Sequence, residues 1–170
     1  MAIWMWVLLI IIICQRLGEL IIAKKNERWL KERGGVENGE EHYKWFILLH
    51  ISFFLCLLIE TMVNYKVDYS INHILMAVFI LTQIGRVWCI YSLGRFWNTK
   101  IITLPGTNLI KKGPYKYMKH PNYVIVGIEL FIIPFMFGAY LTAFIFPILH
   151  VLLLRIRIPQ EEEALVTSIT

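Results

Sequence analysis

Apolar residues along the chain gather into long runs that polar segments separate. The first run extends from Ile3 to about Ala23, the second from Trp45 to Val63, and the third from about His73 to Leu93. Each run approaches the roughly 20 residues that an α-helix needs to cross about 30 Å of hydrocarbon. The pattern therefore predicts three membrane-spanning helices in the first part of the chain.

A fourth apolar run, Tyr123–Leu154, is too long for one straight span. It is interrupted by Pro134, Gly138 and Pro147. Because glycine tolerates a tight turn and proline ends or kinks a helix, we expect two short spans that turn at residues 137–139. The predicted fold class is an all-α integral membrane protein with about five transmembrane helices.

The composition excludes an ordinary water-soluble globule, a disordered chain and a fibrous repeat. Of the 170 residues, 58% are hydrophobic and 17% are charged, and the mean hydropathy is +0.61. Soluble domains average roughly 45–50% apolar and about 25% charged residues. The length fits one membrane domain, residues 1–170.

Positive charge is concentrated in particular connections between the runs and in the tail. Six cations lie between the first and second runs, six more lie between the third and fourth, and the tail adds Arg155 and Arg157. The connection between the second and third runs holds only Lys66, which Asp68 balances. Because lysine and arginine stay on the cytoplasmic side, the amino terminus is predicted outside and the carboxyl tail inside. The net charge of +5 then indicates contact with anionic lipid, and no nucleic acid partner is expected.

The segment Thr107–Tyr123, TNLIKKGPYKYMKHPNY, is the densest in unusual residues. Its Gly-Pro and His-Pro pairs break helices, so irregular backbone is expected beside the membrane. Such backbone has to be buried in protein or line a wet cavity, because unsatisfied amides are costly in lipid. The alternative is an interfacial belt, with tyrosines at headgroup depth and lysines that meet phosphate.

The tail, RIRIPQEEEALV, forms a second polar cluster. One interpretation is a solvated helix start after Pro159, where carboxylates in the first turn are stabilising. The other is an Arg/Glu pair that faces the His-Pro segment at the cytosolic mouth of the helices.

The motifs of the two clusters occur in an order that resembles the isoprenylcysteine carboxyl methyltransferase family. The order is Gly113-Pro114-Tyr115, then His120-Pro121-x-Tyr123, a helical hairpin, and Arg157-x-x-x-Glu161-Glu162-x-x-Leu165. The resemblance implies an all-helical integral membrane enzyme that uses S-adenosylmethionine. It covers residues 94–170, which would form the catalytic core that binds cofactor and substrate, with residues 1–93 as a three-helix scaffold.

The resemblance also implies a cofactor site, to which we add the nearby cation Lys100. The expected cofactor residues are Lys100, Thr107, Asn108, Leu109, Ile110, Tyr115, His120, Pro121, Asn122, Tyr123 and Glu161. The expected catalytic residues are Glu161 and Arg157, and Arg157 would orient the acceptor oxygen. His120 is either a general base or a cofactor ligand. No metal site is expected, since Cys/His pairs at zinc spacing are absent from the sequence.

Two departures from the family pattern stand in this core. Lys119 replaces an arginine before His-Pro, which keeps the charge but loses the bidentate fork. Ile125 stands where a glycine is frequent, with Gly127 displaced.

Charged residues inside predicted spans are functional candidates by default. Arg86 and Glu129 fall at similar depth, so they are predicted to pair, either as a structural ion pair or as part of a substrate-binding pocket. Glu60 lies near the outer end of the second run and is expected to reach the interface.

The predicted function is O-methyl transfer from S-adenosylmethionine to a lipophilic enol or phenol, such as an alkylpyrone, at the cytosolic face of a bacterial plasma membrane. An enolic pyrone hydroxyl is acidic enough to ionise near neutral pH, so such an acceptor requires no strong base. The alternatives are carboxyl methylation of prenylcysteine-like substrates, methylation of phospholipid amines, and a non-enzymatic transporter or scaffold. The expected partners are the lipid bilayer and the lipophilic acceptor, and a lipid-producing synthase that supplies the acceptor is left open.

Overall fold

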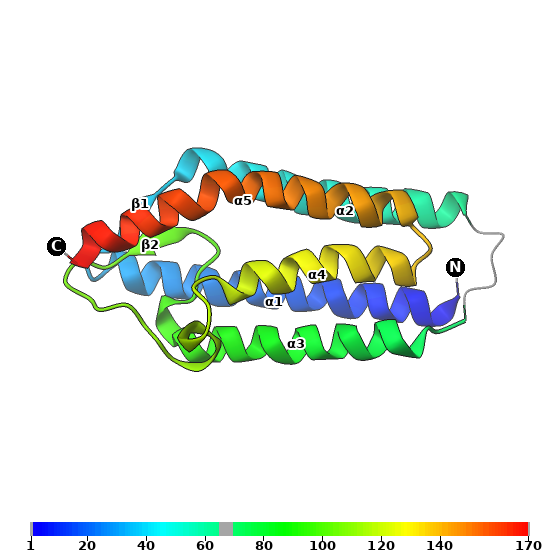
Figure 1. The fold of residues 1–170 in the computed structure, drawn as a ribbon, viewed down its shortest axis with the longest axis horizontal. Helices are drawn as coiled ribbons and strands as arrows, with labels where there is room; N and C mark the ends of the chain where they lie inside the picture. Colours follow the sequence, from blue (N-terminus) through cyan, green and yellow to red (C-terminus); the bar gives the residue numbers. More distant parts are fainter. Residues whose placement is uncertain (1, 65–69, 170) are drawn as a thin grey trace.

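The computed structural model describes residues 2–64 and 70–169, which form an elongated bundle of helices (Figure 1). The residues Lys66 and Asp68 of the predicted second connection lie outside this part. The helices are α1 (Ile3–Lys31), α2 (Glu40–Val63), α3 (His73–Leu93), α4 (Pro121–Met136) and α5 (Tyr140–Ile169). The prediction of an all-α fold is therefore confirmed.

Four of these helices, α1, α2, α3 and α5, are long and apolar enough to cross a membrane. Helix α4 is apolar but has only 16 residues. The N terminus and the α4–α5 turn lie at one end of the bundle and the C terminus lies at the other (Figure 1). The membrane character is supported, whereas five spans and their orientation stay predictions.

The hairpin between α4 and α5 turns where the sequence indicated. Gly138 lies in the left-handed region, with φ of 68°, which favours glycine over residues with a Cβ atom. The expectation of two short arms holds for α4, which has 16 residues, but it is wrong for α5, which continues through Pro147 and Pro159 for 30 residues. The glutamates after Pro159 consequently lie within a helix and do not begin one. A proline in a helix costs roughly 3 kcal/mol, which packing of α5 against α2 and α4 offsets.

Helix α1 extends about two turns beyond its predicted end at Ala23. Its last turns, KKNERWLK, consist mainly of good helix formers, so the apolar run ends before the helix does. Several cations that the hydropathy pattern assigned to a connection therefore lie on α1.

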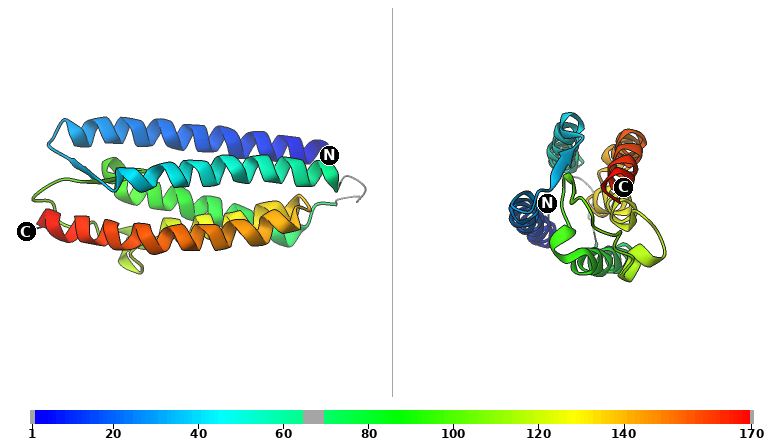
Figure 2. Two further views of the ribbon diagram at one scale, coloured as in Figure 1. Left: turned by 90° about the horizontal axis from the view of Figure 1, so that it is seen from above. Right: turned by 90° about the vertical axis from the view of Figure 1, so that its left-hand side faces the viewer.

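A two-stranded antiparallel sheet joins the first and third connections. Strand β1 (Val36–Asn38) pairs with β2 (Ile101–Thr103), and Glu37 lies opposite Ile102. Figure 2 shows both connections at the C-terminal end of the bundle, where the segment between α3 and α4 crosses the end of the helices. The sheet fixes one wall of the site described below.

The core of the bundle is apolar, and so is most of its outer face. Met5, Ile12, Leu57 and Phe137 are fully buried between the helices. Ile21, Ile74 and Leu141 are at least 70% exposed although they are large and apolar. A helix face of this kind suits acyl chains better than water.

Glu60, near the end of α2, binds the first turn of α5, and its predicted position at the interface stays a prediction. Its carboxylate accepts hydrogen bonds from the backbone N–H groups of Leu141 and Thr142, both at 2.8 Å, and from the Thr142 hydroxyl at 2.7 Å. It thereby caps the N-terminus of α5, where unpaired donors and the helix dipole favour a negative charge.

We expect Glu60→Ala to lower the free energy of unfolding by about 1–2 kcal/mol, because two backbone donors lose their acceptor. Glu60→Gln keeps one acceptor oxygen, so its free energy of unfolding is expected to fall by about half as much. Thermal unfolding of both variants in detergent measures the difference. An alanine variant as stable as the wild type would contradict the cap.

Candidate functional site

A cavity of about 410 Å³ lies at the C-terminal end of the bundle, between the segment that follows α3 and the last turns of α5. It lies within the range of roughly 300–1,000 Å³ that is typical of small-molecule sites. The predicted cofactor residues that line it are Lys100, Thr107, Asn108, Leu109, Ile110, Tyr115, His120, Asn122, Tyr123 and Glu161. The remaining one, Pro121, is buried at the start of α4.

Irregular backbone forms one wall of the cavity, as predicted. It contains one 3₁₀ turn, η2 (Gly113–Lys116), which begins at a glycine with φ of 54°. A Cβ atom on Gly113 would lie 2.0 Å from the Ser92 hydroxyl oxygen, so only glycine allows this close approach to α3. Tyr115 consequently lines the cavity, whereas Tyr117 is 77% exposed and fits the interfacial belt.

Glu161 is the centre of a polar cluster in the cavity wall. Its carboxylate accepts a hydrogen bond from the Tyr123 hydroxyl and lies 3.7 Å from Nδ1 of His120. The His120 ring stacks on the Tyr123 ring with centroids 5.4 Å apart, and its Nε2 lies 3.4 Å from Glu162. Because both ring nitrogens face carboxylates, His120 is arranged to hold Glu161 in place, and its roles as general base or cofactor ligand both stay predictions.

Arg157 contacts the cavity through Tyr123. Its Nε donates to the Tyr123 hydroxyl at 2.7 Å and its Nη2 donates to the Thr99 carbonyl at 2.6 Å. The guanidinium is buried and lies 4.9 Å from the centroid of the Phe46 ring. Arg157 is absent from the cavity lining itself, so in this conformation it orders the hydroxyl that binds Glu161.

The protonation of His120 and Tyr115 follows from these neighbours. The Glu161 carboxylate raises the pKa of His120 above its ordinary value, against the effect of burial. Burial raises the pKa of the Tyr115 hydroxyl well above the usual range. Tyr115 is therefore a neutral hydrogen-bonding group, and it does not act as a base near neutral pH.

The raised pKa of His120 predicts that its pair with Glu161 contributes most to the stability of the fold under mildly acidic conditions. Such a group stabilises the fold fully below its unfolded pKa, and the contribution disappears as pH rises through the folded pKa. The difference in Tm between wild type and His120→Gln is therefore expected to be larger at about pH 6 than at about pH 9. Scanning fluorimetry at the two pH values measures it, and a difference that grows with pH would contradict the pairing.

Lys100 lines the cavity, but its ammonium group is directed at carboxylates of the first part of the chain. It lies 2.9 Å from Glu27 on α1 and 2.9 Å from Glu37 on β1. The hydrogen bond with Glu27 raises the pKa of Lys100. No pattern in the sequence indicates either carboxylate, because Glu27 comes from α1 and Glu37 from the three-residue strand β1, both far from Lys100 in the chain.

The cavity fits a ligand such as S-adenosylmethionine, which combines cationic groups with an aromatic base. Glu161 and Glu162 place negative charge on the lining, while Phe96, Leu165 and Tyr115 supply apolar and aromatic surface. Within the described residues, the Asn122 Oδ1 atom is buried without a hydrogen-bond partner although its residue lines the cavity. A buried acceptor of this kind is costly unless a ligand donor or a water satisfies it.

Arg86 and Glu129 pair as predicted, but they lie apart from the cavity lining. Arg86 Nε donates to Glu129 at 3.2 Å, and Gln83 donates to the same carboxylate at 2.8 Å. Arg16 lies 2.6 Å from Glu129 and 2.8 Å from Glu19, and Arg86 lies 3.3 Å from Glu19. Two arginines and two glutamates thus form a neutral cluster between α1, α3 and α4, which favours a structural ion-pair network over a substrate pocket.

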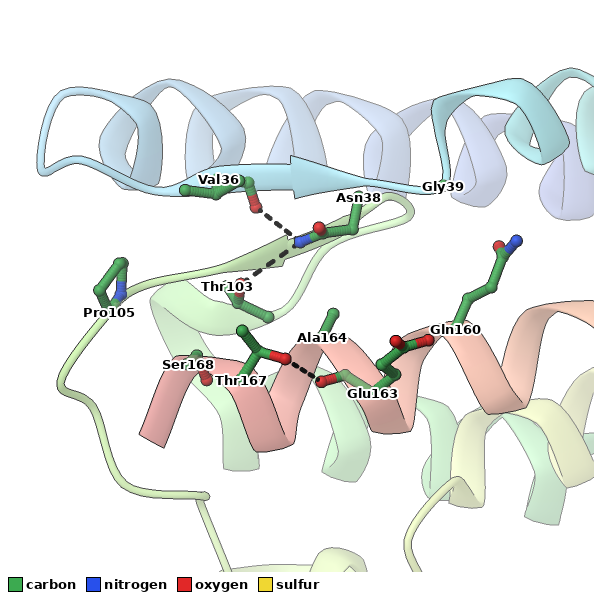
Figure 3. Close-up of a pocket in the computed structure, with 10 residues that line it drawn as sticks. All are labelled: Val36, Asn38, Gly39, Thr103, Pro105, Gln160, Glu163, Ala164, Thr167 and Ser168. Atoms are coloured by element: carbon green, nitrogen blue, oxygen red, sulfur yellow. Dashed lines mark hydrogen bonds between the residues drawn. The ribbon is translucent and has the colours of Figure 1, made fainter. Parts of the chain in front are cut away.

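A second cavity, of about 400 Å³, adjoins the first and shares Thr103 and Ser168 with it. Figure 3 shows Gln160 and Glu163 rising from α5 toward β1 and β2. The three consecutive glutamates are therefore divided, with Glu161 and Glu162 on the first cavity and Glu163 on the second.

Comparison with known proteins agrees with the geometry. The chain is 45% identical to the uncharacterized protein YpbQ of Bacillus subtilis, over 94% of this chain and 95% of that protein. It is 28% identical to an uncharacterized protein of Haemophilus influenzae, over 91% of this chain and 90% of that protein. The sequence model of the isoprenylcysteine carboxyl methyltransferase family matches residues 74–167, which include the cavity segments and most of α5. Since this match covers more than half of the chain, the protein belongs to the isoprenylcysteine carboxyl methyltransferase family, a family of membrane methyltransferases.

Proposed function

We propose that the protein transfers a methyl group from S-adenosylmethionine to an acidic oxygen of a lipophilic acceptor. The single observation that carries the proposal is the convergence of ten of the eleven expected cofactor residues on one cavity at the C-terminal end of the bundle. Family membership supports the methyl transfer and the general use of this cofactor.

In this proposal the cavity wall binds the cofactor, which supplies an electrophilic methyl group on its sulfonium. Glu161 and Glu162 provide the negative charge for its cationic part, and Asn122 Oδ1 accepts a hydrogen bond from it. The rings of Tyr115 and Tyr123 offer π-faces to a cation or to the adenine, a contact worth roughly 0.5–2 kcal/mol. His120 and Tyr123 hold Glu161 in position before the cofactor binds.

The acceptor is proposed to be an enol or a phenol on a long alkyl chain, because the cavity lacks an obvious base. Both nitrogens of His120 face carboxylates, and Tyr115 stays neutral. An alkylpyrone hydroxyl is already ionised near neutral pH, and a phenol, with a pKa of roughly 10, loses its proton far more readily than an aliphatic alcohol. Arg157 is the cation closest to the Tyr123 hydroxyl, and we assign it to orient and stabilise the anionic oxygen.

The lipophilic acceptor enters from the bilayer and the polar cofactor enters from the cytosol, so a site at the inner interface serves both. The cations near the C-terminal end of the bundle support this orientation, since lysine and arginine stay on the cytoplasmic side. The membrane would be the plasma membrane, as the bacterial relatives indicate.

Carboxyl methylation of a prenylcysteine-like substrate is the second candidate. The family's name and the absence of a base in the described cavity both favour it, because a carboxylate is also ionised at neutral pH. A phospholipid amine is less suitable, since a base would have to remove its proton. A transporter or scaffold does not explain the cavity lining.

The test is methyl transfer by the detergent-purified full-length protein from labelled S-adenosylmethionine to a panel of acceptors. The panel contains a long-chain pyrone, a long-chain phenol, a prenylated cysteine, a phospholipid amine and a long-chain alcohol. Transfer to the pyrone or phenol is expected, with a rate that falls as pH drops below the acceptor's pKa. Preferred transfer to the amine or the alcohol would contradict the proposed acceptor class, and no transfer to any member would contradict the proposed activity.

A further inference from the structure

An open groove of about 530 Å³ lies on the outer side of the wall that bounds the main cavity. It is bordered by Trp29 on α1, by Tyr91 on α3, and by Arg95 in the short 3₁₀ turn η1 (Gly94–Phe96). Lys111 and Lys112 complete it from the segment that leads to η2. The groove is thus formed where three separate segments meet at the end of the bundle.

The three cations of the groove are exposed and uncompensated. In residues 2–64 and 70–169, no ion pair or side-chain hydrogen bond involves Arg95, Lys111 or Lys112. This distinguishes them from Lys100 and Lys119, which both lie within 3.0 Å of a carboxylate. The sequence from 70 to 128 also holds no acidic residue that could compensate them.

An apolar stripe on α3 leads away from the groove. Ile84, Val87, Trp88 and Tyr91 are all about half exposed or more, and Tyr91 is 87% exposed. Their spacing of three and four residues places them on one face of the helix. Because α3 is long and apolar enough to cross a membrane, this face would contact acyl chains in a bilayer.

We propose that the groove binds the headgroup of an anionic phospholipid, with one acyl chain lying along the stripe of α3. Three uncompensated cations complement a phosphodiester, and Trp29 and Tyr91 suit the boundary between headgroup and acyl chain. The adjoining apolar stripe favours a lipid over a free phosphate, which would leave it without a partner. The groove adjoins the methyl-transfer cavity, since Leu93, Phe96, Leu109, Ile110 and Lys111 line both, but lipid binding there does not depend on the proposed reaction.

The test is native mass spectrometry of the full-length protein during titration with phosphatidylglycerol or phosphatidylcholine. The variant Arg95→Gln/Lys111→Gln/Lys112→Gln removes the groove cations. Lys24→Gln/Lys25→Gln/Arg155→Gln removes the same charge from exposed positions outside the groove and is the matched control. Each cation near a lipid surface contributes about fivefold in affinity, so the groove variant is expected to bind phosphatidylglycerol roughly a hundredfold more weakly. The control is expected to change by less than about threefold.

Three results would overturn the proposal. Equal binding of phosphatidylcholine would mean that only apolar contact holds the lipid. An equal loss in the control would mean that the whole basic surface is responsible, and displacement by millimolar inorganic phosphate would mean a simple anion site. Photo-crosslinking of the unmodified protein with a phosphatidylglycerol that carries a reactive acyl chain tests the same proposal without substitutions. Labels are expected on the α3 stripe, and labels confined to other helices would contradict the proposal.

Discussion

Arg157→Ala is expected to lower kcat for methyl transfer by roughly 10²–10³-fold at saturating cofactor. A loss of this size is typical when an enzyme loses a group that stabilises charge on a reacting oxygen. Arg157 is buried and donates to Tyr123 and to the Thr99 carbonyl, so its loss also leaves the Tyr123 hydroxyl without one of its partners. Arg157→Lys keeps the charge but not the forked geometry, and an intermediate rate is expected.

Steady-state kinetics at saturating cofactor separate this role from simple support of the cofactor site. The matched control is Arg155→Ala, because Arg155 lies two residues away on α5 and is exposed. The control is expected to keep nearly full activity. If Arg157→Ala regained wild-type turnover once cofactor was saturating, Arg157 would serve only to position Tyr123 and the acceptor role would be wrong.

The second large effect is expected in the neutral cluster between α1, α3 and α4. Glu129→Leu removes the carboxylate that Arg16, Gln83 and Arg86 share, and it leaves excess positive charge inside the bundle. Breaking a buried ion pair from one side typically costs about 3–5 kcal/mol, so a matching loss of unfolding free energy is expected.

A double variant tests whether the cost comes from the unbalanced charge. Arg86→Leu/Glu129→Leu removes one cation and one anion, and the 2.8 Å pair between Arg16 and Glu19 remains. The double variant is expected to recover at least half of the stability that Glu129→Leu loses. Detergent-titration unfolding measures the stability of both variants, and a double variant no more stable than Glu129→Leu would contradict the charge-balance explanation.

Local patterns along the sequence predicted the helices and the hairpin because their causes are local. The third apolar run coincides with α3, and Gly138 provides the turn that the fourth run required. The expectation that a helix begins after Pro159 is wrong. The effect of a proline on the backbone is local, whereas the packing of α5 against α2 and α4, which keeps the helix continuous, involves distant parts of the chain. Similarly, the apolar run predicts only the part of α1 that lies in the bilayer. The helix continues past the end of that run because the following residues are good helix formers.

The candidate site was predictable where the residues are close in sequence, and not where distant segments supply the contacts. All the expected cofactor residues between Thr107 and Tyr123 except Pro121 line one cavity, because the same irregular segment carries them. Glu37 reaches Lys100 through the pairing of β1 with β2, which three-residue strands do not reveal, and Glu27 reaches it from the last turns of α1. The cap that Glu60 provides for α5 depends in the same way on two helices that meet only in the fold.

The central claim is that the cavity around Glu161 binds the cofactor, and calorimetric titration with S-adenosylhomocysteine tests it most directly. The full-length protein in lipid-supplemented detergent is compared with Glu161→Gln and with Glu163→Gln, a neighbouring glutamate that faces the second cavity. Binding by the wild type and by Glu163→Gln is expected, with a loss of about 30- to 150-fold in Glu161→Gln, equivalent to the roughly 2–3 kcal/mol of a hydrogen bond to a charged group. No binding by the folded wild type, or equal binding by all three proteins, would contradict the claim.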